Sequence, residues 1–589
     1  MKVTLVSVNA KYVHTGLAGR YLSELGSELS EHEIDHQEYS INQPIAGIVS
    51  ELLRNPSKAY GFSAYIWNLN EILQVCRQIK KINPEIILFL GGPEVSYEEE
   101  ILMEKEPCID LIVRGEGENV LLKLLEIKFQ PMKYAQVPSL TYRKEMKIIK
   151  NPLGEPTPMK SLPFAYSDKD MHEPGKIFYY ESSRGCPYSC AFCLSAQDGN
   201  RVRYRPLEQV TAHMAIFLSQ KVKQVKFIDR TFNADPDRAM ALLDFLEEKH
   251  NGITNFHFEC SPDRLTPVFI ERLATLPEGM VQLEIGIQST NPETSRAIHR
   301  PREIDLYRRV IEQLRRPDNI HLHVDLIAGL PFEDYSSFRE SFNDVFSLDA
   351  HVIQLGFLKL LKGSELRMRN EEYKLICSED PPYEVLKTPW LSYKDVQHLK
   401  WIEDLVDKYN NSQGFIMSLP FALDQFNSPF DFFEKFTEYW VGLDLHLRKH
   451  RSGALYSILL DFSQKWDLTE EARKEWEERL LFDSLYANGE PFCKDHSATK
   501  MKRSQKNALA ELFLEKQMLF EGNLRKKRYP DVAIARFETL GKVIKPGNHK
   551  KISLIFFKKR RPLFVQPCEL YQLKEEKDNV QFNRLAIRL

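Results

Sequence analysis

The chain has 589 residues, of which 43% are hydrophobic and 28% are charged, and its formal net charge is −3. This length exceeds one hydrophobic core and predicts several domains, while the nearly balanced charge excludes an overall attraction to nucleic acid or anionic membranes. The N-terminal apolar run is too short for a signal peptide, and no run approaches the roughly 18 residues of a spanning helix. We therefore expect a cytoplasmic protein with no membrane partner.

Apolar strand-like runs alternate with amphipathic stretches from Lys2 to about Leu125. The strand-like runs read KVTLVSV, AYGFSAY, IILFLGG and DLIV. The helical stretches cover residues 17–29, 70–81 and 96–105, followed by NVLLKLLE. Continuous apolar strands separated by helices predict a parallel sheet covered on both faces. We assign residues 1–130 to a doubly wound domain and the proline-rich, polar residues 131–175 to a linker.

A second alternation of strands and helices fills residues 176–368. Its strand-like runs read KIFYYESS, QVKFID, NFHFEC, VQLEIGIQS, LHVDLIAGLP and VIQLGFLKLL. The helices predicted between them cover residues 207–219, 236–249, 267–275, 305–315 and 335–346. Repeating units of this size predict a parallel barrel or part of one, here a partial (β/α)6 barrel. Reactive groups on such folds lie at the C-terminal ends of the strands.

Residues 369–589 have a mixed pattern with long helical stretches such as YKDVQHLKWIEDLVDKYNN, and we expect a mainly helical C-terminal domain. The stretch KKISLIFFKKRR predicts a strand. Between Lys494 and Arg561, Lys and Arg outnumber Asp and Glu. Such a segment suits contacts with RNA phosphates, which makes nucleic acid a candidate partner. A solvated basic face is the alternative.

Three of the nine cysteines lie close together in SSRGCPYSCAFC: Cys186, Cys190 and Cys193. Three thiolates can bind three irons of a cubane cluster and leave the fourth iron open to a substrate or cofactor. A structural zinc site normally has a fourth ligand, but no second cysteine pair exists, and His172 and His213 lack ligand-like spacing. Gly185, Pro187 and Ser189 predict a loop, which argues against buried structural thiols.

The C-x3-C-x2-C spacing, with Phe192 before the last cysteine, resembles the radical SAM superfamily over roughly residues 176–366. The resemblance implies that the three cysteines hold a [4Fe-4S] cluster and that S-adenosyl-L-methionine binds its open iron. It also implies reductive cleavage of that cofactor to a 5′-deoxyadenosyl radical, with an electron donor such as flavodoxin or ferredoxin. The cofactors supply the difficult chemistry, and the protein orients them.

Further candidate contacts with S-adenosyl-L-methionine lie at the ends of predicted strands. The superfamily's Gly-Gly-Glu is replaced by FIDRTFN, where Asp229 is the candidate for the ammonium group and a helix cap is the alternative. Arg300 in AIHRP is the candidate for the carboxylate, since a guanidinium fork matches a carboxylate, and a solvated helix arginine is the alternative. The stretches EIGIQST and DLIAGLPFED resemble the superfamily's fourth and fifth strands. They supply the remaining candidates: Glu284, Gln288, Ser289, Ile327 and Gly329. We expect Glu333 or Asp334 to cap a helix.

A doubly wound sheet binds ligands beyond the C-terminal edge of its strands. Small residues at that edge would let the backbone approach a bulky, flat ligand: Ser63, Gly91 and Gly92. GGPEVS and RGEGE resemble the cobalamin-binding domain that precedes the radical SAM barrel in one large subgroup. The Asp-x-His-x-x-Gly signature that supplies a histidine to cobalt is absent, and we expect His14 to be a loop or capping residue. A flavodoxin-like scaffold without a cofactor is the alternative.

Together these resemblances imply an enzyme that cleaves S-adenosyl-L-methionine and, with cobalamin, methylates an unactivated carbon of an unknown substrate. One alternative keeps both cofactors in a radical cyclisation or rearrangement without methyl transfer. Another is an RNA-binding or RNA-modifying protein in which the basic segment carries the function. Residues 371–589 resemble an uncharacterised domain attached to some cobalamin-type radical SAM proteins.

Overall fold

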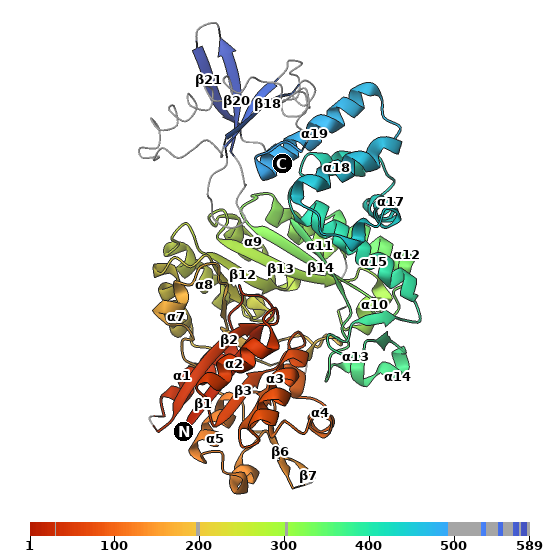
Figure 1. Ribbon diagram of the computed structural model, residues 1–589. Helices are drawn as coiled ribbons and strands as arrows, with labels where there is room; N and C mark the ends of the chain where they lie inside the picture. The colour runs from red at the N-terminus through yellow and green to blue at the C-terminus, as the bar shows by residue number, and fades with distance from the viewer. Residues whose placement is uncertain are drawn as a thin grey trace. The chain divides into compact units, whose positions relative to one another are not determined.

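The computed structural model describes residues 1–29, 31–145, 147–195, 201–300 and 304–492, together with four strands nearer the C-terminus (Figure 1). These residues fall into two compact units. The first unit contains Met1–Phe338 and Gly356–Val396, and the second contains Arg339–Leu355 and Gln397–Leu589. None of the described helices has the length and apolar character that crossing a lipid bilayer requires.

The N-terminal part of the first unit is a seven-stranded sheet with the order β2-β1-β3-β4-β5-β6-β7. Its strands are β1 (Lys2–Asn9), β2 (Glu33–Ser40), β3 (Ala59–Ser63), β4 (Ile87–Gly91), β5 (Leu111–Val113), β6 (Leu140–Lys144) and β7 (Lys147–Lys150). Its helices are α1 (Leu17–Ser27), α2 (Ile45–Arg54), α3 (Leu69–Ile82), α4 (Glu99–Lys105) and α5 (Glu118–Glu126). Strands β1 to β5 pair in parallel, which confirms the predicted doubly wound sheet.

This sheet has a hydrophobic core on each face because successive side chains of a strand point to opposite faces. Val6 and Phe62 pack with residues of α2 and α3 on one face, and Leu5 and Phe89 pack with residues of α5 on the other. Figure 1 shows the helices on both faces. Burial on both faces explains why the central strands are continuous apolar runs.

Two parts of this sheet differ from the sequence-based expectation. Strand β2 was not predicted, because its sequence EIDHQEYS carries few apolar residues; it is an edge strand that pairs only with β1. Strands β6 and β7 lie inside residues 131–175, which we had assigned to a linker, and pair antiparallel with β5 and with each other. The first part of that segment therefore belongs to the sheet.

The second sheet of the chain has six strands in the order β15-β14-β13-β12-β11-β8. These are β8 (Phe178–Tyr180), β11 (Gln224–Phe227), β12 (Asn255–Cys260), β13 (Val281–Gln288), β14 (His321–Ala328) and β15 (Val352–Phe357). The helices between them are α7 (Leu207–Ser219), α8 (Pro236–Glu248), α9 (Pro267–Ala274), α10 (Pro292–Ala297), α11 (Ile304–Arg315) and α12 (Tyr335–Phe346). Sequential strand order with intervening helices is the predicted partial barrel, and every predicted strand and helix is present.

Short elements complete the first unit. They are the antiparallel pair β9 (Ser183–Gly185) and β10 (Val202–Tyr204), the pair β16 (Ile376–Cys377) and β17 (Val385–Lys387), and the helices α6 (Asp168–Met171), α13 (Glu365–Met368) and α14 (Asn370–Tyr373). Strand β9 comes directly before the first cysteine of the cysteine loop, which we define as residues 186–193.

The second unit is helical through residue 488 and ends in a four-stranded antiparallel sheet. Helix α15 (Tyr393–Val406) leads into this unit, and the helices that follow are α16 (Ser418–Leu423), α17 (Pro429–Gly442), α18 (Ser452–Phe462) and α19 (Glu470–Asn488). The strands of its sheet are β18 (Val532–Phe537), β19 (Ile552–Phe557), β20 (Glu569–Glu576) and β21 (Asn579–Leu585). Strand β19 is the one predicted from KKISLIFFKKRR; the other three were not predicted. Apart from β18 and β19, the basic segment from Lys494 to Arg561 lies outside the described residues.

Candidate functional site

The cysteine loop is held by backbone contacts from several barrel elements. The Ala191 N–H donates to the carbonyl of Ile298 at 3.2 Å, and a nitrogen of His299 lies 3.0 Å from the carbonyl oxygen of Ser189. Gly185, which precedes the loop, has a φ of +95°, and a Cβ atom there would lie 2.0 Å from the carbonyl oxygen of Arg201. Only glycine fits at that position, so this residue fixes how the chain enters the loop.

Cys186 and Cys190 are buried and Cys193 is half-buried. Among the described residues, no three His, Cys, Asp or Glu side chains converge as ligands of one metal ion would. In a cubane cluster each of the three thiolates would bind a different iron.

Asp229 lies just after β11 and anchors the backbone ahead of the cysteine loop. Its buried carboxylate accepts hydrogen bonds from the Ser182 N–H at 2.7 Å, the Ser182 hydroxyl at 2.5 Å and the Ser183 N–H at 3.2 Å. Burial raises the pKa of Asp229, and these hydrogen bonds oppose the rise. The carboxylate thus already has a structural role, while its contact with an ammonium group stays a prediction.

Arg300 and Gln288 lie together beside Cys190. Arg300 Nη1 is 3.8 Å from Cys190 Sγ, and Nη2 donates to the carbonyl of Gly286 at 2.8 Å. A Cβ atom on Gly286 would lie 2.3 Å from Gln288 Nε2 and 3.6 Å from Arg300 Nη1. Gln288 Oε1 and Arg300 Nε are buried and have no hydrogen-bond partner among the described residues. A buried acceptor and a buried donor are therefore available to a polar ligand next to a cluster cysteine.

Three further predicted residues, Ser289, Ile327 and Gly329, lie at the C-terminal ends of β13 and β14. The Ser289 hydroxyl donates to the fully buried Glu333 at 2.5 Å. Asp334 accepts from the Ser337 N–H at 2.8 Å, so it caps the following helix as expected. Gly329 has a φ of +90°, and a Cβ atom there would lie 2.7 Å from Val385 Cγ1. Ile327 lies on β14, on the same face as Asp325.

The polar face of the barrel sheet carries the predicted residue Glu284 together with four residues that we did not predict: Lys226, His257, Glu259 and Asp325. Glu284 forms ion pairs with Lys226 at 3.2 Å and His257 at 3.0 Å. Burial opposes ionisation of Glu284, but the hydrogen bond from His257 and the charge of Lys226 hold its pKa below the ordinary value. Burial raises the pKa values of Glu259 and Asp325, and Glu284 adds to both rises. The alternation of polar residues in NFHFEC and LHVDLIA was the signal that identifies this face.

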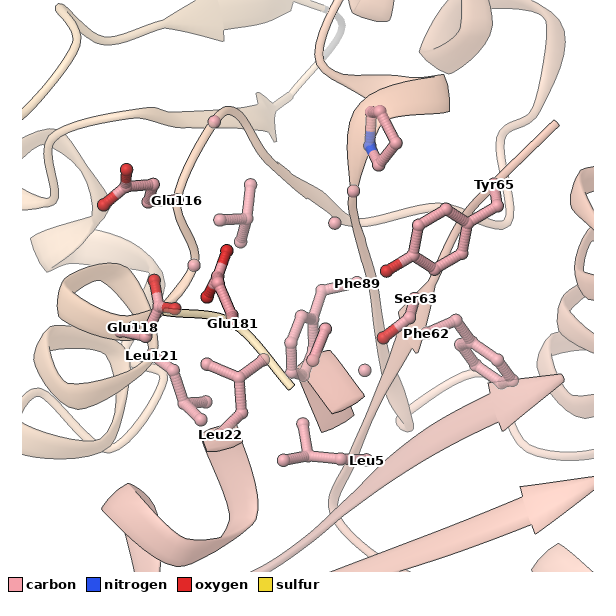
Figure 2. Close-up of a pocket in the computed structure, with 18 of the residues that line it drawn as sticks. Leu5, Leu22, Phe62, Ser63, Tyr65, Phe89, Glu116, Glu118, Leu121 and Glu181 are labelled. Carbon is pink, nitrogen blue, oxygen red and sulfur yellow. The ribbon is translucent and has the colours of Figure 1, made fainter. Parts of the chain in front are cut away.

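The C-terminal edge of the N-terminal sheet encloses a cavity of about 220 Å³ (Figure 2). Its apolar lining includes Leu5, Leu22, Phe62, Phe89, Val113 and Leu121, and its glycines are Gly61, Gly91, Gly92, Gly115 and Gly117. The predicted residues Ser63, Gly91 and Gly92 therefore line one cavity. Figure 2 shows Glu116, Glu118 and Glu181 on one side of it and Ser63 with Tyr65 on the other. Glu181 and Arg184, which also line it, come from the segment that leads into the cysteine loop.

His14 lies outside this lining. One of its ring nitrogens is 2.7 Å from the hydroxyl of Tyr179 on β8, and burial followed by the charges of Lys11, Lys226 and Lys176 lowers its pKa. No histidine is found among the described residues that line the cavity. His14 thus lies in a loop, as expected, and its ring contacts the barrel strand β8.

Three family models match this chain. Residues 3–125 match the B12 binding domain, residues 180–345 match the Radical SAM superfamily, and residues 371–555 match a protein of unknown function (DUF4080). The first two ranges contain the glycine-lined cavity and the cysteine loop.

Two curated relatives are similar to about half of this chain. The cobalamin-dependent radical SAM methyltransferase TokK of Streptomyces tokunonensis is 27% identical over 320 residues, which cover 50% of this chain and 46% of TokK. The 2-(S-pantetheinyl)-carbapenam-3-carboxylate methyltransferase of Streptantibioticus cattleyicolor is 27% identical over 321 residues, with the same coverage of each chain. The chain thus spans less than half the length of these relatives.

Two solved structures share the fold. The cobalamin-dependent S-adenosylmethionine radical enzyme OxsB, with aqua-cobalamin bound, aligns with a TM-score of 0.57 and 15% identity, over 83% of this chain and 84% of OxsB. The radical S-adenosylmethionine methyltransferase TsrM from Kitasatospora setae, with cobalamin and a [4Fe-4S] cluster bound, aligns with a TM-score of 0.53 and 17% identity, over 65% of this chain and 78% of TsrM.

Proposed function

This chain joins a B12-binding domain to a radical SAM domain, and we propose that it is a cobalamin-dependent radical SAM methyltransferase that acts on an unactivated carbon. The observation that carries the proposal is that the segment leading into the cysteine loop also lines the cavity of the N-terminal sheet. Glu181 and Arg184 line the cavity of the N-terminal sheet, and Cys186 follows two residues after Arg184. A carrier bound in that cavity would lie beside a radical generated at the cysteine loop.

The cavity fits part of a corrinoid. Its volume of about 220 Å³ is below the range of roughly 300–1,000 Å³ for sites that hold a whole drug-sized ligand, so it would take only the flat nucleotide base of cobalamin. Apolar side chains form its walls, and glycines at its mouth let the backbone approach. A Cβ atom on Gly92, whose φ is +112°, would lie 2.5 Å from the carbonyl oxygen of Ala64. Without a histidine in the described lining, cobalt would receive no imidazole from this cavity.

The region around Cys190 fits the polar groups of S-adenosyl-L-methionine. Arg300 is a suitable partner for its carboxylate, since one guanidinium edge is already fixed by Gly286 and Nε is unsatisfied. Gln288 Oε1 is a suitable acceptor for a hydroxyl group. When bound, the cluster supplies an electron that cleaves S-adenosyl-L-methionine, and cobalamin carries the methyl group.

The relatives' names support methyl transfer over rearrangement, since TokK and the carbapenam relative are both named methyltransferases. The substrate class stays open. The proposal also includes a small electron-transfer partner such as flavodoxin or ferredoxin, because reductive cleavage needs one electron each time.

The proposal is tested with anaerobically reconstituted protein, methyl-labelled S-adenosyl-L-methionine, a reductant and a cell extract. We expect S-adenosylhomocysteine and 5′-deoxyadenosine in equal amounts, with a product that is heavier than its substrate by about 14 Da plus the extra mass of the label. Formation of 5′-deoxyadenosine without S-adenosylhomocysteine would instead favour rearrangement. Protein that binds no cobalamin would contradict both readings.

A further inference from the structure

Arg184 on β9, which leads into the cysteine loop, contacts the N-terminal domain. Arg184 Nη2 donates to Glu118 at 2.6 Å, Nη1 lies 3.1 Å from Glu116, and Nε donates to Glu181 at 2.9 Å. Glu116 and Glu118 belong to the glycine-rich loop RGEGE and the start of α5, whereas Glu181 follows β8. The side chain of Arg184 is 14% exposed, so these contacts form in a largely dehydrated position.

The glycine-rich loop RGEGE, which supplies Glu116 and Glu118, is itself held by further contacts. Glu116 accepts from the Thr157 N–H at 2.7 Å and also pairs with Arg203, which lies opposite Arg184 in the β9–β10 pair. The Gly115 N–H donates to Ser96 Oγ at 3.0 Å. The glycine-rich loop therefore has a fixed position, and a three-pronged guanidinium contact transmits that position to β9.

Stability alone does not account for this arrangement. Burying one arginine among three glutamates has a large desolvation cost, and well-packed apolar residues often stabilise a protein as much as a buried ion pair does. The two domains are also joined elsewhere, because Glu98 pairs with Arg367 at 2.8 Å and Glu94 pairs with Lys362 at 2.9 Å. The Arg184 contacts additionally fix the position of the chain two residues before Cys186.

We infer that Arg184 is a positioning residue that fixes the cysteine loop against the glycine-rich loop, so that the two cofactor sites keep one defined separation. The inference rests on the proposed function for the identity of the cofactors, but the link itself is independent of them. A displacement of about 1 Å between reacting groups is enough to reduce a rate by roughly a hundredfold.

The test compares the whole protein with Arg184→Met, which keeps an unbranched, flexible stem and removes the guanidinium group with its charge. Arg272→Met is the matched control, because Arg272 bridges Asp244 at 2.7 Å and Glu247 at 2.5 Å from α9 to α8 but touches neither site. Pulsed electron paramagnetic resonance measures the dipolar coupling between the reduced cluster and cob(II)alamin. Hydrogen exchange measures the protection of residues 115–118.

We expect one narrow coupling in the wild type and in Arg272→Met, and a broadened, shifted coupling in Arg184→Met. Exchange at residues 115–118 should become about tenfold faster in Arg184→Met, because the loop loses one of its fixed partners. Iron content should remain at the wild-type level. An Arg184→Met protein with wild-type coupling and wild-type exchange would overturn the inference.

A second variant keeps the inference falsifiable if Arg184→Met does not fold. Glu118→Gln preserves the shape of the side chain and weakens only one of the three contacts, so a smaller shift in the same direction is expected. Unchanged exchange in Glu118→Gln would then overturn the inference. A wild-type protein that binds no cobalamin would contradict the proposed function, while exchange at residues 115–118 would still decide whether Arg184 holds the loop.

Discussion

A Cβ atom on Gly61 would lie 2.2 Å from Cζ of Phe89, because the two residues are direct neighbours on the adjacent strands β3 and β4 and the ring lies over the glycine. Both residues line the cavity of the N-terminal sheet. The absence of a side chain at Gly61 therefore decides where the ring lies, and the ring decides how much of the cavity is open.

Gly61→Ala should displace the Phe89 ring and reduce the room for a ligand. Overpacking of this kind costs about 1–3 kcal/mol of stability. We expect cobalamin affinity, measured by equilibrium dialysis, to fall by about tenfold or more, since the ring lines the cavity and its displacement changes the shape of that cavity. Gly47→Ala on α2 is the control, because a Cβ atom there would have no neighbour within 4 Å. Equal cobalamin affinity in the two variants would contradict this account.

Gln288→Met should weaken the binding of S-adenosyl-L-methionine without destabilising the empty protein. Gln288 Oε1 is buried without a hydrogen-bond partner among the described residues, and such a group costs about 1–3 kcal/mol. We therefore expect the unfolding free energy to stay the same or rise by about 1 kcal/mol. Affinity for S-adenosyl-L-methionine, measured by calorimetry, should fall about tenfold, the effect of one lost hydrogen bond.

Gln282→Met, on the same strand and face, is the matched control for that variant. The Gln282 amide lies 2.8 Å from His323 Nε2, so its removal should destabilise the protein by about 1–2 kcal/mol. Affinity for S-adenosyl-L-methionine should not change. A destabilised Gln288→Met protein with normal affinity would show that Gln288 has a structural role only.

The fold was largely predictable because the central strands and their helices carry strong periodic patterns. Strand β2 was missed for a physical reason: an edge strand packs against one neighbour only and needs few apolar residues. The antiparallel strands β6 and β7 were hidden by the prolines around them. The terminal sheet gave a clear signal only at β19, where all residues of ISLIFF except Ser553 are apolar.

The site was predictable at the level of motifs and less so at the level of contacts. The cysteine spacing and the small residues Ser63, Gly91 and Gly92 mark where ligands would bind. The bond from Asp229 to Ser182 joins residues 47 positions apart, and the bond from Arg184 to Glu118 joins residues 66 apart. Such pairings depend on how strands and domains are arranged in space, which no local pattern encodes.

The second unit should lose stability as pH rises because of Asp483. This buried carboxyl accepts from the Ser418 N–H at 2.8 Å and the Ser418 hydroxyl at 2.6 Å at the start of α16. Burial raises its pKa from 3.8 to about 7 although these bonds oppose the rise. The folded state therefore holds a proton that the unfolded state releases between about pH 4 and pH 7.

Stability from this group is fully present below about pH 4 and is lost as pH rises to about 7, by at most about 4 kcal/mol at about 1.36 kcal/mol per pH unit. Asp483→Asn should remove this dependence, because an amide does not titrate. Hydrogen exchange of peptides from α16 and α19 at pH 5 and pH 7 measures the difference. Parallel pH profiles for the wild type and Asp483→Asn would refute the assignment.

The most direct test of the central claim is the formation of 5′-deoxyadenosine from S-adenosyl-L-methionine by anaerobically reconstituted, reduced protein. The wild type should form it, and so should Cys76→Ala, which removes a fully buried thiol of the N-terminal core. Cys190→Ala should lose iron and form none, while its cobalamin affinity stays at the wild-type level, since Cys190 lies outside the cavity lining. Formation of 5′-deoxyadenosine by Cys190→Ala at the wild-type rate would contradict the claim that this loop generates the radical.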